Sequence, residues 1–245
     1  MSSTKELASI LDATTMPADL VGLLLEAAPP LWLASDSASA LAADMALCHP
    51  VLASGEVRAR VSTMAQGWRL TVVATDRPGL LADTASALAH ENCSIASASA
   101  ASWTHLHLAL HSVTISGAPP AATVLDRLGA RLRSAPATSS GSRFVPVGRA
   151  KVEVTGETDG DAILTVTAPD QAGLLAAICR WFADRGAGIQ AAWVAQNVAG
   201  LAEDVFVVRG PVDRDELERF LGVPASPRRS MVSNRFRTHR QVSSG

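Results

Sequence analysis

The chain has 245 residues, of which 48% are hydrophobic and 18% are charged, and its formal net charge is -2. This balance gives no electrostatic reason to expect binding to nucleic acid or to an anionic membrane. Three widely spaced cysteines, Cys48, Cys93 and Cys179, argue against a disulfide framework, and the N-terminus lacks the regions of a secretory signal. We therefore expect a cytoplasmic protein.

Residues 1–55 predict a small helical region that is separate from the rest of the chain. Candidate helices cover residues 5–13, 18–28 and 36–48. The most apolar stretch, Leu20–Ala34, is interrupted by Glu26 and two prolines, so it is too short to cross a bilayer.

The chain that follows repeats itself with an offset of 94 residues. Thirteen of the thirty-three positions in 70–102 are identical in 164–196. Five of these identities are alanines, so the evidence lies in the ordered Leu-Thr-Val and Asp-x-x-Gly-Leu-Leu blocks. After a one-residue slip, His111–Gly117 also aligns with Asp204–Gly210. We interpret this pattern as an internal duplication.

Both copies predict the same order of elements. The β-rich runs are residues 57–61, 70–74, 95–103 and 108–115 in the first copy, and 151–155, 163–168, 189–196 and 204–208 in the second. A helix with one apolar stripe follows the second and the fourth run of each copy. Each unit therefore reads β-β-α-β-β-α, an α+β sandwich with two helices on one face of an antiparallel sheet. We expect the early strand to take a sheet edge that a later strand would otherwise fill.

These patterns divide the chain into five parts. We expect a helical N-terminal region over 1–55, a first unit over 56–134, a linker over 135–150, a second unit over 151–222 and a basic, flexible tail over 223–245.

The repeated Asp-x-x-Gly-Leu-Leu turn admits a structural role and a binding role. Asp76 and Asp170 can cap the helices that follow, while Gly79 and Gly173 permit unusual backbone angles and the close approach of another group. Unpaired N–H groups in the first turn of a helix favour a carboxylate, such as that of an amino acid. The alternative is a plain turn whose two leucines enter the core.

These turns carry a family resemblance. Val72–Ala82 followed by Asn92–Ile95 resembles the ACT domain, a ferredoxin-like regulatory module that binds amino acids. The second copy resembles it as well, in Thr167–Ala176, Gly186–Ile189 and Glu203–Val207. The tandem order and the Asp-Arg-Pro-Gly-Leu-Leu motif are most similar to the C-terminal regulatory region of the PII uridylyltransferase/uridylyl-removing enzyme. This resemblance covers roughly residues 56–221.

The resemblance implies two tandem ACT sandwiches, each with an extra preceding strand, whose sheets pair side by side or face to face. It implies that a ligand lies at the interface, against the strand-to-helix turn and the start of the next strand. The implied contacts in the first copy are Asp76, Arg77, Gly79, Leu80, Leu81, Asn92, Ser94 and Ile95. Those in the second copy are Asp170, Gln171, Gly173, Leu174, Leu175, Gly188 and Ile189.

The sequence departs from the family pattern at three places. In the second copy, Gln171-Ala172 replaces the Arg-Pro of the family motif. His107–His111 replaces the family's Asp-x-Phe in the first copy, and Asp44 stands where the family usually has a histidine.

Other constellations predict neither a metal site nor catalysis. His105, His107 and His111 share a face of an extended strand, but residues 105–107 fall in a predicted turn and no cysteine or carboxylate cluster accompanies them. Cys93 fits a buried thiol better than a nucleophile. We find no phosphate-binding glycine loop and no paired-aspartate metal site. We therefore expect no catalytic residue, no metal and no cofactor.

Three functions fit these observations. The favoured one is a non-catalytic regulatory protein that binds a small ligand, an amino acid, and acts through a regulatory protein partner or through a homodimer of its sheets. The second is an interaction or dimerisation module with degenerate pockets. The third is a fragment-like relative of the PII uridylyltransferase, which would need catalytic motifs that the sequence lacks.

Overall fold

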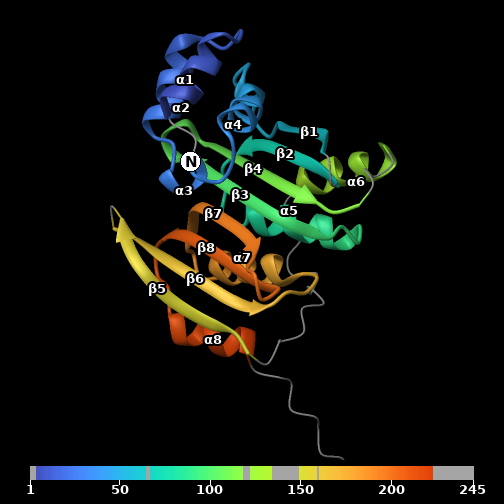
Figure 1. Cartoon of the computed structure of the whole chain (residues 1–245), viewed down its shortest axis with the longest axis vertical. Coiled ribbons are helices and arrows are strands. Elements are labelled where there is room, and N and C mark those ends of the chain that lie inside the picture. Colours follow the sequence, from blue (N-terminus) through green and yellow to red (C-terminus); the bar gives the residue numbers. More distant parts are fainter. Residues whose placement is uncertain (1–3, 65–66, 118–121, 134–148, 159, 223–245) are drawn as a thin grey trace, which may run out of the picture.

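The computed structural model describes residues 4–64, 67–117, 122–133, 149–158 and 160–222 (Figure 1). The predicted tail and most of the predicted linker lie outside the described residues. Four helices precede the sheet: α1 (Thr4–Asp12), α2 (Ala18–Glu26), α3 (Pro30–Leu33) and α4 (Ala38–Met45). In the described part of the chain, no helix is long and apolar enough to cross a membrane.

The remaining elements follow the predicted β-β-α-β-β-α order twice. The first half consists of β1 (Val57–Met64), β2 (Gly67–Thr75), α5 (Leu80–His90), β3 (Ile95–Trp103), β4 (Leu108–Ile115) and α6 (Ala122–Arg133). The second half consists of β5 (Lys151–Thr158), β6 (Asp161–Pro169), α7 (Leu174–Asp184), β7 (Gly188–Gln196), β8 (Leu201–Arg209) and α8 (Arg214–Gly222). Short 3-10 turns lie at Ala46–Cys48 and Thr104–Leu106.

All eight strands form one antiparallel sheet in the order β1-β2-β4-β3-β7-β8-β6-β5. The early strands β1 and β5 take the two outer edges, as the sequence predicts. The halves join at the centre, where β3 pairs with β7 from Ser97 opposite Ala195 to Ala101 opposite Ala191. Main-chain hydrogen bonds therefore continue from one half into the other.

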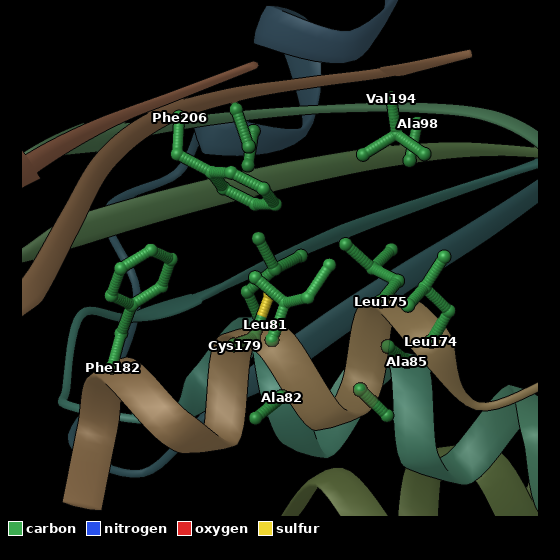
Figure 2. Packing of buried hydrophobic residues seen from close by; sticks show 14 of the residues in the cluster. Leu81, Ala82, Ala85, Ala98, Leu174, Leu175, Cys179, Phe182, Val194 and Phe206 are labelled. Atoms are coloured by element: carbon green, nitrogen blue, oxygen red, sulfur yellow. The ribbon is translucent and has the colours of Figure 1, made fainter. Parts of the chain in front are cut away.

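Helices α5 and α7 pack against each other on one face of this sheet (Figure 1). The largest core cluster lies between these helices and the strands. In Figure 2, Leu81 of α5 and Leu175 of α7 point from the helices toward the strands, Leu175 on the side of Ala98 and Val194 of the central strands. One continuous core thus spans both halves, because the stripe of each helix faces the same sheet.

The N-terminal helices cover the opposite face of the first half, so the expectation that residues 1–55 form a separate region is wrong. Their cluster includes Val73 of β2, Leu110 of β4 and Trp103 of β3. Trp103 meets Trp32 of α3 edge to face, with ring centroids 5.6 Å apart, and its indole N–H donates to the carbonyl of Leu24 at 2.9 Å. Ala101 and Trp103 of β3 belong to this cluster, so the helices supply the layer that buries this end of the strand.

Asp44 attaches the helical layer to the sheet. This fully buried carboxylate of α4 accepts hydrogen bonds from Arg69 of β2, from Thr71 Oγ1 at 2.6 Å and from Ser112 Oγ at 2.6 Å. Asp36 also pairs with Arg69, at 2.6 Å. Asp44 therefore has a structural role, since three side chains from two strands donate hydrogen bonds to it.

Candidate functional site

The two repeated turns have the same backbone conformation. Gly79 lies at φ +79° and Gly173 at φ +86°, both in the left-handed region that side-chain-bearing residues rarely adopt. Helices α5 and α7 begin at the next residue in each case. The glycine is required here because the chain must reverse between a buried strand and a buried helix.

The prediction that Asp76 and Asp170 cap the helices is wrong. Neither α5 nor α7 has a side-chain cap hydrogen bond. The carboxylate of Asp76 instead accepts a hydrogen bond from Ser102 Oγ of β3, and that of Asp170 accepts one from Gln196 Nε2 of β7. Each aspartate thus ties its turn to the third strand of its own half, since the glycine, and not the aspartate, occupies the capping position.

Two cavities lie between the halves, and the fifteen residues named from the sequence line them. The first cavity, of about 170 Å³, is lined among others by Asp76, Arg77, Gly79, Leu80, Leu81, Gly188 and Ile189. The second cavity, of about 230 Å³, is lined among others by Asn92, Ser94, Ile95, Asp170, Gln171, Gly173, Leu174 and Leu175.

The grouping of these residues by copy is wrong. Each cavity combines the turn of one half with the helix-to-strand loop of the other half. The reason is the pairing of β3 with β7, which runs antiparallel and places the start of each strand beside the end of the other. A sequence alignment of the copies cannot show this exchange, because it does not specify which strands meet at the centre.

The first cavity contains an arginine beside the carboxyl group of Asp76. Arg77 lines it and pairs with Asp83 of α5 at 2.7 Å. Asp83 also pairs with Arg180 of α7, so one carboxylate links two arginines from different halves. The Nη1 atom of Arg77 is buried and has no hydrogen-bond partner among the described residues. Two guanidinium groups share one carboxylate, which leaves donors free for an anion.

His111 of β4 also lines the first cavity. The side chain is buried, and its Nδ1 lies 3.1 Å from Thr84 Oγ1 of α5. Burial, and next the nearby Arg77, lower the pKa of His111 to about 4. The imidazole is therefore neutral at pH 7.

The second cavity carries acidic groups in the corresponding places. Asp204 of β8 is 1% exposed, lines the cavity, and has an Oδ1 atom without a hydrogen-bond partner in the described part of the chain. Burial, and next the charge of Asp170, raise the pKa of Asp204 to about 8. Gln171 stands where the first turn has Arg77, so the positive charge of that arginine is missing from this turn.

His111 and Asp204 occupy equivalent sheet positions. His111 lies between Val72 and Ala100 of its neighbouring strands, and Asp204 lies between Val166 and Val194. The sequence prediction missed both residues as cavity groups. The signal was present, because the alignment of 111–117 with 204–210 pairs them, and the substitution of histidine by aspartate at a buried position indicates a change of chemistry.

The described residues show no arrangement suited to metal or thiol chemistry. No three His, Cys, Asp or Glu side chains among them are grouped to hold a metal ion. Burial raises the pKa of Cys48 to about 12 and raises those of Cys93 and Cys179 as well. These shifts oppose formation of the thiolate that a nucleophilic cysteine requires.

Comparison with known proteins adds little. No family model and no curated protein matches the chain. A solved structure that is similar is the crystal structure of aspartate kinase from Synechocystis, with 16% sequence identity and a TM-score of 0.38. The likeness covers 63% of this chain and 26% of that chain. Identity and TM-score are both too low for the likeness to bear on fold or function.

Proposed function

We propose that the chain is a non-catalytic regulatory protein that binds an amino acid at the two cavities between its halves. In this proposal residues 56–134 and 151–222 are two ACT-type units in tandem, each with an extra edge strand. The observation that carries the proposal is the convergence of the fifteen residues, chosen from the sequence alone, into two cavities.

The size of the cavities supports a small ligand. A cavity of roughly 150 Å³ is enough to hold benzene, and the two cavities here measure about 170 and 230 Å³. Both open beside the first turn of an eleven-residue helix, α5 or α7. The N–H groups of such a turn attract a carboxylate. An amino acid is small enough for these cavities and carries the carboxylate that these N–H groups attract.

Regulation follows from the position of the cavities. A ligand in either cavity contacts both halves, so it stabilises the arrangement that pairs β3 with β7 over any arrangement that separates them. The change in stability grows with ligand concentration according to mass action. A regulatory partner, or a second copy of the chain, would bind preferentially to one of these two arrangements of the halves.

Thermal denaturation in the presence of each of the twenty amino acids tests the proposal. We expect one or a few amino acids at millimolar concentration to raise the melting temperature, and Gly79→Val to reduce the increase from any ligand of the first cavity. Flat curves for all twenty would favour the alternative of an interaction module with degenerate pockets. Turnover of a nucleotide substrate by the pure protein would instead favour an enzyme related to the PII uridylyltransferase.

A further inference from the structure

The second cavity has the chemistry of a cation site. Its described lining includes two carboxyl groups, Asp170 and Asp204, and contains no lysine, arginine or histidine. Asp170 is exposed and lies at the turn, whereas Asp204 is buried at the level of the sheet. A cation entering past Asp170 would therefore meet a second carboxyl group at the bottom of the cavity.

Asp204 lacks a partner that its burial requires. A buried polar atom without a hydrogen bond costs roughly 1–3 kcal/mol, and a carboxylate costs more. The Oδ1 atom of Asp204 is such an atom, and the side chain is 1% exposed. Its neighbours across the sheet, Val166 and Val194, are apolar and offer no donor. The missing donor is the feature that a ligand would supply.

The lining also contains the uncharged polar residues Asn92, Ser94 and Gln171, and a group of apolar side chains that fits a short hydrocarbon chain. This group includes Ala85, Ile95, Leu174, Leu175 and Val194, drawn from both halves. Figure 2 shows Leu174, Leu175 and Val194 close together at one end of the core. A ligand with an alkyl group and one positive charge would satisfy both parts of the cavity.

We propose that the second cavity binds a small primary amine, whose ammonium group donates to Asp204 and is attracted by Asp170, and whose alkyl group packs against the leucines. We expect the first cavity, which has Arg77 and His111 in the corresponding places, not to bind this group. The inference rests on the proposed function in using one of the same two cavities, and it names the ammonium group as the part of the ligand that this cavity recognises.

Titration calorimetry with propylammonium chloride tests this inference on the full chain. The ionisable groups that act on Asp204 are Asp170 of the turn and Cys179 of α7, and Cys93 lines the same cavity. The pKa of Asp204 in the protein without ligand is about 8, so the amine must displace a proton from this carboxyl group at pH 7. Asp204 is mostly ionised at pH 9, and the affinity for the amine should therefore be about tenfold higher at pH 9 than at pH 7. Binding at pH 7 should release close to one proton, which the dependence of the heat on the buffer's ionisation enthalpy reports.

Three variants identify the group that binds. Asp204→Asn keeps the size of the side chain and removes the charge, so it should abolish both binding and proton release. Asp170→Asn changes an exposed residue and should weaken binding several-fold in a protein that folds normally. His111→Gln alters the equivalent position of the first cavity and should leave the affinity for propylammonium unchanged.

A chemical readout localises the ligand. Cys93 is half-buried and lines the second cavity, whereas Cys48 and Cys179 are buried. We expect propylammonium to slow the alkylation of Cys93 by iodoacetamide in the wild type and to leave it unchanged in Asp204→Asn.

The outcomes separate the two proposals. Absence of propylammonium binding at pH 9, or unchanged binding by Asp204→Asn, overturns this inference even if amino acids stabilise the protein. Propylammonium binding that Asp204→Asn abolishes supports the inference even if all twenty amino acids give flat melting curves.

Discussion

Ser99 of β3 and Trp193 of β7 lie directly opposite each other at the centre of the sheet. They are also equivalent positions of the repeat, since they are 94 residues apart. A local twofold axis therefore passes between them and relates the two cavities. The axis applies to the backbone and not to the side chains that matter for binding, because Arg77 and His111 correspond to Gln171 and Asp204.

Replacement of Gly79 tests whether the turn needs its left-handed conformation and its open space. An alanine Cβ at this position would lie 3.2 Å from the guanidinium of Arg180 and 3.4 Å from Ala183. We expect Gly79→Ala to lower the free energy of unfolding by about 1–2 kcal/mol from backbone strain alone, and further through these contacts. Gly200→Ala is the matched control, because Gly200 has φ +75° and nothing within 4 Å of its added Cβ. Equal losses in urea denaturation would show that the contacts with α7 do not matter.

The buried imidazole of His111 should make stability depend on pH on the acid side. Its pKa is lowered to about 4 in the folded protein, below the unfolded value, so the contribution is present above about pH 6.5 and is lost as the pH falls toward 4. Between pH 7 and pH 4.5 the wild type should lose roughly 2–3 kcal/mol more than His111→Gln. Urea denaturation of both proteins at the two pH values measures this difference, and parallel losses would contradict it.

Asp204 should produce the opposite dependence on the alkaline side. Its folded pKa of about 8 lies above the unfolded value, so its contribution is fully present below about pH 4 and is lost as the pH rises toward 8. Between pH 6.5 and pH 8, where His111 stays neutral, the wild type should lose roughly 1–2 kcal/mol relative to Asp204→Asn. A constant difference between the two proteins across this window would show that Asp204 is already ionised at pH 6.5.

The Asp44–Arg69 pair should hold the helical layer on the sheet. Asp44→Ala leaves Arg69, whose side chain is 10% exposed, without its buried partner. Loss of one member of a buried pair costs about 3–5 kcal/mol. Asp36→Ala removes the second, more exposed partner of the same arginine, and should cost less than about 1 kcal/mol. If urea denaturation gave comparable losses of unfolding free energy for Asp44→Ala and Asp36→Ala, the Asp44–Arg69 pair would not be the main attachment of the helical layer.

Local pattern was sufficient to predict the order of elements. The strands Ile95–Trp103 and Leu108–Ile115 have the predicted bounds, because alternation and β-branched content are local properties. The partner of an edge strand is not a local property. The sequence therefore did not predict that β3 meets β7, that residues 4–48 cover the sheet, or that Gly188 and Ile189 join the first turn and not the second.

The role of individual polar residues was harder to predict than the position of the site. Asp76 and Asp170 have the spacing of capping residues, yet the left-handed glycine ends the turn and frees both carboxylates for other partners. His111 and Asp204 lie in strands whose sequence gives no local sign of a cavity. Their burial depends on the helix above them, which belongs to the tertiary structure.

The covalent link between the two halves removes a constraint that symmetric dimers obey. When two identical chains form a pair of equivalent sites, one substitution alters both sites at once, so they cannot diverge. Here β3 and β7 belong to a single polypeptide, and a change in either turn is inherited by one site alone. Duplication followed by fusion thus permits a protein to keep one ancestral specificity while it acquires another.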